Sequence, residues 1–84
     1  MRVRVLIFGE AASRLGRSLD LELDEDATVR SLMGLLAGRV GRPLRVDDGL
    51  TVLVNGRNIA LLDGLETRLR DGDLVVLLPP LSGG

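Results

Sequence analysis

The chain has 84 residues, enough for one small domain with a modest hydrophobic core. Its 11 basic and 12 acidic residues nearly balance, which argues against a nucleic-acid-binding protein or a basic membrane-binding patch. The sequence contains no cysteine and no histidine, which excludes a disulfide framework, a thiolate nucleophile and the commonest general base. Because no signal peptide or membrane span is recognisable, we expect a soluble cytoplasmic protein with no metal site.

The first half of the chain predicts two strands and one long helix. Residues 2–8 and 19–24 alternate in polarity, as strands with one buried face do, and a polar loop over residues 9–17 separates them. Thr28 is a favourable N-cap, and apolar residues recur behind it at helical spacing until Gly41 ends the run. The apolar stripe consists of Val29, Leu32, Met33, Leu36 and Val40.

The second half predicts two more long strands, joined by irregular structure. Residues 50–54 form a strand, and the Asn-Gly pair at 55–56 is a strong turn signal. Residues 59–69 indicate short, irregular structure. Residues 74–78 are apolar at every position, which favours a central strand covered on both faces. The proline pair at 79–80 ends this strand because proline cannot donate to a ladder.

This order of elements predicts an α+β fold of the β-grasp (ubiquitin-like) type, a mixed four- to five-stranded sheet packed on one main helix. We expect the β-grasp domain to span residues 1–80 and a flexible C-terminal tail to span residues 81–84. The tail ends in Gly-Gly. Without Cβ atoms, this backbone can enter a narrow tunnel and present its terminal carboxylate to another protein.

Three motifs occur in the second half of the chain, in the same order and at the same spacing as in a known family. They are Val54-Asn55-Gly56, Leu69-Arg70-Asp71-Gly72-Asp73 and Leu78-Pro79-Pro80-Leu81-Ser82-Gly83-Gly84. With the order of elements, they resemble the MoaD branch of the MoaD/ThiS-type ubiquitin-like sulfur carriers, and the resemblance covers the whole chain. This chain has leucines at 77–78, where many members carry aromatic residues. Residues 8–10 and 55–58 also resemble archaeal ubiquitin-like small modifiers.

The resemblance implies a carrier protein with no catalytic residue and no bound cofactor. In this family a partner enzyme uses ATP to adenylate the C-terminal glycine, which is Gly84 here. Sulfur attack then gives a thiocarboxylate that donates sulfur, in this branch toward molybdopterin, the molybdenum/tungsten cofactor. Leu81, Ser82 and Gly83 form the tail that carries Gly84. The expected partners are an adenylating, ubiquitin-activating-like enzyme and the large subunit of molybdopterin synthase.

Other functions are compatible with the same sequence. The main alternative is a ubiquitin-like modifier that is attached through Gly84 to lysines of target proteins, and one tail can serve both roles. Because the chain has no lysine, such a modifier is expected to form single attachments. An enzyme is disfavoured by the missing nucleophiles and metal ligands. A binding module with an accidental diglycine is the remaining possibility.

Strand alternation predicts a docking surface beside the tail. Leu6 and Phe8 share the water side of the first strand, and Leu53 shares the polar side of the third. Val76 and Leu78 join them if the last strand runs parallel beside the first, as the resemblance implies. An exposed apolar patch of this kind is typical of protein interfaces. The alternative is that these side chains lie under loops as part of the core.

The carboxylates suggest no active site. Asp20, Glu22 and Asp24 lie on the outer face of one strand, where acidic side chains usually form a solvated surface. Asp71 and Asp73 flank a glycine, which is typical of a tight turn.

Overall fold

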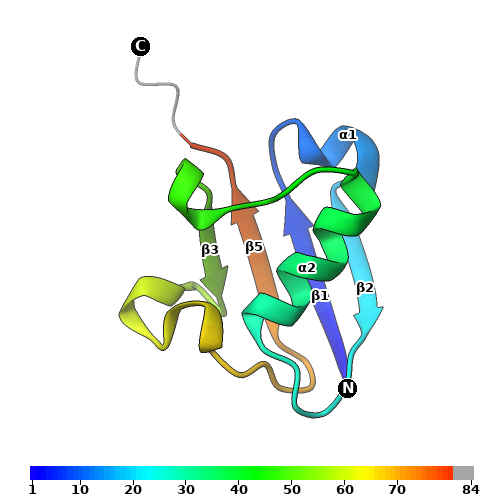
Figure 1. Cartoon of the computed structure of the whole chain (residues 1–84). Helices are drawn as coiled ribbons and strands as arrows, with labels where there is room; N and C mark the ends of the chain where they lie inside the picture. The colour runs from blue at the N-terminus through cyan, green and yellow to red at the C-terminus, as the bar shows by residue number, and fades with distance from the viewer. Residues whose placement is uncertain (81–84) are drawn as a thin grey trace.

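The computed structural model describes residues 1–80 (Figure 1). The strands are β1 (Arg2–Ile7), β2 (Ser18–Glu22), β3 (Thr51–Val54), β4 (Arg57–Asn58) and β5 (Leu74–Leu78). The helices are α1 (Ala11–Leu15) and α2 (Val29–Val40), and three short 3₁₀ helices are η1 (Val46–Asp48), η2 (Ile59–Leu61) and η3 (Gly64–Glu66). None of the helices in residues 1–80 has the length and hydropathy needed to traverse a bilayer.

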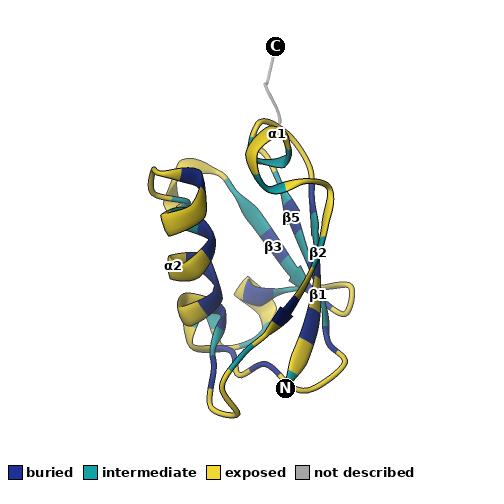
Figure 2. Cartoon of the chain, turned by 90° about the vertical axis from the view of Figure 1, so that its right-hand side faces the viewer, coloured by how far each residue is buried: buried dark blue, intermediate teal, exposed yellow. Residues whose placement is uncertain are grey.

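The five strands form one mixed sheet in the order β2-β1-β5-β3-β4. β1 and β5 run parallel to each other, and every other pair of neighbours is antiparallel. α2 packs on one face of the sheet, and no helix of residues 1–80 covers the opposite face (Figure 2). The predicted β-grasp architecture is therefore confirmed, including the parallel pairing of the first and last strands.

The predicted helix is confirmed together with its capping residues. The Ser31 N–H donates to Thr28 Oγ1 over 3.3 Å, and the Thr28 N–H donates to Ser31 Oγ over 3.2 Å, which completes a capping box. Gly41 ends α2 in the left-handed conformation, with a φ of 84°. The buried residues of α2 are those of the predicted stripe, Val29, Leu32, Met33, Leu36 and Val40.

These side chains form the core with the inner face of the sheet, and Leu32 is 0% exposed. Leu32→Ala is expected to lower the free energy of unfolding by about 2–5 kcal/mol, because close-packed neighbours refill the cavity only in part. Urea denaturation measures this loss. The matched control is Leu35→Ala in the same helix, where the side chain is 41% exposed and the expected loss is much smaller. Equal losses for the two variants would contradict the packing described here.

The predicted polar loop at residues 9–17 contains a helix that the sequence did not indicate. α1 has neither a side-chain cap nor an acidic residue in its first turn, so the usual start signals are missing. Ala11, Ala12 and Leu15 are partly buried against the core, and this packing accounts for the helix.

The prediction that residues 74–78 are covered on both faces is wrong. Val75 and Leu77 are buried toward α2, whereas Leu74, Val76 and Leu78 on the other face are only half-buried among the described residues. A continuous apolar run therefore marks two different surfaces here. One belongs to the core and the other is open.

Candidate partner-binding site

Three residues of the predicted patch form a row across the open face of the sheet. Leu6 of β1 and Leu53 of β3 lie on either side of Val76 of β5, each in register with it. All three side chains are half-buried, while their neighbours along each strand are buried on the α2 side. The predicted parity of these strands is therefore correct, and the three residues are not part of the core.

Phe8 and Leu78 extend this row to the end of the sheet where the described chain stops. The Phe8 N–H donates to the carbonyl of Leu77 over 3.1 Å, which prolongs the ladder beyond β1. Its side chain is 51% exposed, and Leu78 is half-buried. We call Leu6, Phe8, Leu53, Val76 and Leu78 the apolar patch. Leu6, Leu53, Val76 and Leu78 lie on the open face, and Phe8 follows the end of β1 beside them. The role of all five in binding a partner stays a prediction.

The tail residues Leu81, Ser82, Gly83 and Gly84 lie outside the described residues. The last described residues, Pro79 and Pro80, are exposed and follow β5 directly. The patch therefore adjoins the point from which the chain continues toward Gly84.

Two of the sequence motifs form one hydrogen-bonded corner at the opposite end of β5. Asn55 takes a φ of 52° in the predicted turn between β3 and β4. Its side chain donates to Asp73 Oδ1 over 2.8 Å and accepts from the Leu74 N–H over 2.9 Å. Asp73 Oδ2 also accepts from the Arg70 N–H over 2.7 Å. The predicted turn role of Asp73 is confirmed, and the network fixes the start of β5 against the end of β3.

Asp73→Ala is expected to lower the free energy of unfolding by about 2–3 kcal/mol, because the buried Asp73 carboxylate accepts hydrogen bonds from the Asn55 amide and the Arg70 N–H, and bonds to a charged group contribute about this much. Thermal unfolding monitored by circular dichroism measures the effect. The control is Asp63→Ala, since Asp63 is exposed and its carboxylate accepts no hydrogen bond within residues 1–80. A loss no larger than that of the control would show that the corner does not stabilise the fold.

Asp20, Glu22 and Asp24 are exposed, as expected, although Asp24 lies beyond the end of β2. The two acidic residues of β2 also pair with arginines of β1, which the sequence did not indicate. Arg4 Nε lies 2.9 Å from Asp20 Oδ1, and Arg2 Nε lies 2.9 Å from Glu22 Oε1. The hydrogen bond from Arg4 holds the pKa of Asp20 below its ordinary value. These exposed ion pairs give the β1–β2 side of the open face a polar border beside the apolar patch. Among residues 1–80, no group of three or more acidic residues is placed to hold a metal ion.

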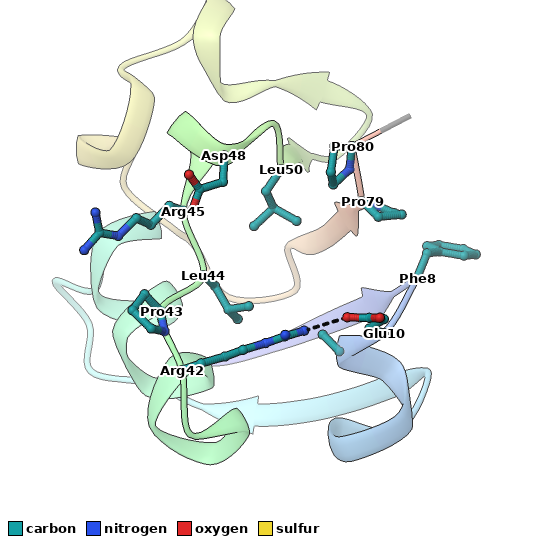
Figure 3. Close-up of a pocket in the computed structure, with 11 residues that line it drawn as sticks. Phe8, Glu10, Arg42, Pro43, Leu44, Arg45, Asp48, Leu50, Pro79 and Pro80 are labelled. Carbon is teal, nitrogen blue, oxygen red and sulfur yellow. Dashed lines mark hydrogen bonds and ion pairs between the residues drawn. The ribbon is translucent and has the colours of Figure 1, made fainter. Parts of the chain in front are cut away.

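A groove that sequence reasoning missed lies next to the patch (Figure 3). It has a volume of about 620 Å³, and Phe8, Leu44, Leu50, Pro79 and Pro80 contribute apolar lining. Arg42 Nη2 lies 3.1 Å from Glu10 Oε2 and links two of the segments that line the groove. The lining residues come from separate parts of the chain, so no local sequence pattern could have indicated the groove.

The sequence matches the ThiS family over residues 5–84. The chain belongs to this family. Its members are small ubiquitin-like carrier proteins and are not themselves catalysts. Small archaeal modifier protein 3 of Haloferax volcanii is 42% identical over 77 residues, covering 81% of this chain and 82% of the relative. A putative sulfur carrier protein of Archaeoglobus fulgidus is 40% identical over 74 residues, covering 77% of this chain and 84% of the relative.

Solved structures extend the likeness to the MoaD branch. The putative molybdopterin converting factor subunit 1 of Pyrococcus furiosus superposes with a TM-score of 0.78 at 27% identity, covering 96% of this chain and 99% of that one. A Helicobacter pylori complex of subunits 1 and 2 of molybdopterin-converting factor contains a chain with a TM-score of 0.65 at 29% identity, with full coverage of both chains. The predicted family and fold are confirmed, and the chain belongs to the family of ubiquitin-like sulfur carriers and small archaeal modifiers.

Proposed function

We propose that this protein carries sulfur on its C-terminal glycine. The observation that carries the proposal is the apolar patch beside the end of β5, in a chain that continues to a Gly-Gly terminus. A partner enzyme binds the patch and receives the tail. The open face thus supplies recognition, and Gly84 supplies the reacting carboxyl group.

The proposed reaction needs no catalytic side chain from the carrier. A carboxylate is a poor electrophile, so an oxygen of the Gly84 carboxylate first attacks the α-phosphorus of ATP, and pyrophosphate leaves. Hydrosulfide then attacks the carbonyl carbon of the acyl-adenylate, a C–S bond forms, and AMP leaves. The product is a thiocarboxylate. ATP is bound by the partner, and we propose that the carrier itself holds no cofactor.

We assign the sulfur to molybdopterin synthesis. The support is the likeness to subunit 1 of two molybdopterin converting factors, one of them solved in complex with its subunit 2. The proposed partners are therefore an adenylating enzyme and the large subunit of a molybdopterin synthase. Both partners bind the same apolar patch, so the carrier can bind only one of them at a time.

Intact-protein mass spectrometry tests the proposal. After incubation with the cognate activating enzyme, ATP and a sulfur donor, we expect the mass change of one carboxyl oxygen replaced by sulfur. Fragmentation is expected to place this change at Gly84. An unmodified C-terminus, under conditions in which a control carrier of the family reacts, would defeat the proposal.

A second role is favoured by the 42% identity to small archaeal modifier protein 3. An amine that attacks the activated Gly84 carbonyl forms an isopeptide bond in place of the thiocarboxylate, again with loss of AMP. Proteomics of the source cells tests this role. Because Arg70 is the last basic residue, we expect tryptic peptides of target proteins whose lysines carry residues 71–84, and we expect these remnants to disappear when the gene is deleted. An unchanged set of remnants in the deletion strain argues against conjugation.

A further inference from the structure

Two glycines that are distant in sequence pack directly against the proline pair that follows β5. A Cβ atom on Gly9 would lie 3.0 Å from both Cβ and Cγ of Pro79. A Cβ atom on Gly49 would lie 2.8 Å from Cβ of Pro80. A methyl group on Gly49 would force Pro80 to move, and one on Gly9 would push Pro79 by a few tenths of an ångström. The two proline rings therefore occupy the space that a side chain at either glycine would need.

Positive φ alone does not explain this arrangement. Gly9 and Gly49 have φ values of +87° and +91°, in the region that favours glycine. Gly41 and Gly72 have equally positive φ values, but a Cβ atom at either position would meet open space. Gly9 and Gly49 thus meet a second requirement, the close approach of a proline ring.

The two contacts hold the proline pair from opposite sides. Gly9 follows β1 and Gly49 precedes β3, and these strands are the two neighbours of β5 in the sheet. The prolines cannot donate backbone hydrogen bonds, so ring packing replaces the ladder at this point. Because the pyrrolidine ring fixes φ, holding the ring also holds the direction of the backbone.

We infer that Gly9 and Gly49 are positioning residues for the activation of Gly84. By accepting the rings of Pro79 and Pro80, they set the point and the direction in which the chain leaves the sheet. Four residues can span about 14 Å at most, so the point at which the chain leaves the sheet after Pro80 limits how far the Gly84 carboxyl can reach into a partner's active site. The inference rests on the proposed function, in which that carboxyl must meet ATP in a partner's active site.

Gly49→Ala and Gly41→Ala form a matched pair that isolates the ring contact. Gly49 has φ 91° and ψ 1°, Gly41 has φ 84° and ψ 16°, and each follows the end of a helix. Both substitutions place alanine in the left-handed region, so both lose melting temperature for that reason. Only the substitution at Gly49 also displaces Pro80.

The kinetic test measures adenylation by the activating enzyme at a temperature where both variants are folded. We expect kcat/KM of Gly49→Ala to fall about 10- to 100-fold, because misplacing a reacting group by about 1 Å has this effect. The fall is expected in kcat, with KM little changed, since the apolar patch still binds the enzyme. Gly41→Ala is expected to react like the wild type. Equal rates for the two variants, or a loss confined to KM, would overturn the inference.

A second measurement needs no activating enzyme. Because the chain has no cysteine, spin labels can be attached only at introduced ones, Leu35→Cys on α2 and Leu81→Cys after the proline pair. We expect the distance distribution between the labels to shift or broaden in Gly49→Ala and to stay unchanged in Gly41→Ala. Identical distributions in the two variants overturn the inference. If the distribution changes as expected but the wild type is never adenylated, the proposed function fails while the positioning of the tail stands.

Discussion

Phe8→Asp is expected to abolish binding of the activating enzyme and to leave the fold intact. The Phe8 side chain is 51% exposed beyond the end of β1, so the core does not depend on it. In the complex, the aspartate would have to lose its hydration against an apolar surface. Aromatic anchors at the centre of an interface contribute about 2 kcal/mol or more, so we expect affinity to fall at least about 30-fold. Titration calorimetry with the activating enzyme measures the loss.

The control for this substitution is Leu61→Asp. Leu61 is a large apolar residue that is even more exposed, at 82%, and it belongs to η2. η2 lies near the end of the sheet opposite to the one at which β1 and β5 end (Figure 1). It is expected to bind the enzyme normally. A Phe8→Asp variant that binds like the wild type would remove the apolar patch from the partner interface. Equal losses of affinity in both variants would show that binding depends on the amount of exposed apolar surface and not on the apolar patch.

Removal of Gly84 is expected to end adenylation without changing the melting temperature. The truncated chain ends in the carboxylate of Gly83, which stops about 3.5 Å short of the original position. A displacement of about 1 Å can already reduce a rate about 100-fold. Binding through the apolar patch is expected to persist, so the truncated protein acts as a competitive inhibitor of the intact one. Pyrophosphate exchange into ATP measures the activation step.

A companion variant, Gly84→Ala, distinguishes the effect of chain length from the effect of side-chain size at the terminal residue. It keeps a carboxylate at the original chain length and adds one Cβ atom, which a narrow tunnel would exclude. We expect it to be activated slowly and to bind normally. Full exchange activity with the truncated protein would show that Gly84 is not the activated residue.

Local patterns were sufficient to predict most of the fold. Alternation predicted β1 and β2, the Asn-Gly turn at 55–56 marked the end of β3, and the apolar stripe with Thr28 and Gly41 predicted α2. Parity along β1 and β3 also placed Leu6 and Leu53 on the open face. Side-chain period is a property of each strand, so a single sequence can reveal it.

Contacts between distant segments could not be predicted in this way. The packing that holds α1 comes from tertiary neighbours and leaves no cap signal in residues 10–16. The proximity of Gly9 to Pro79 and of Gly49 to Pro80 depends on how three strands are arranged in the sheet. The prediction that residues 74–78 are covered on both faces was wrong for a related reason, because hydrophobicity alone does not distinguish a buried face from a half-buried, open one.

Methyl NMR of the protein bound to its activating enzyme tests most directly whether the open face and the tail form one recognition surface. Four residues of the apolar patch carry methyl groups, Leu6, Leu53, Val76 and Leu78. Leu35 on α2 and Leu61 in η2 are exposed internal controls on other parts of the surface. We expect the methyl signals of the patch and of Leu81 to shift on binding, and those of Leu35 and Leu61 to stay in place. Shifts confined to the α2 side, with an unperturbed patch, would contradict the proposed mode of recognition.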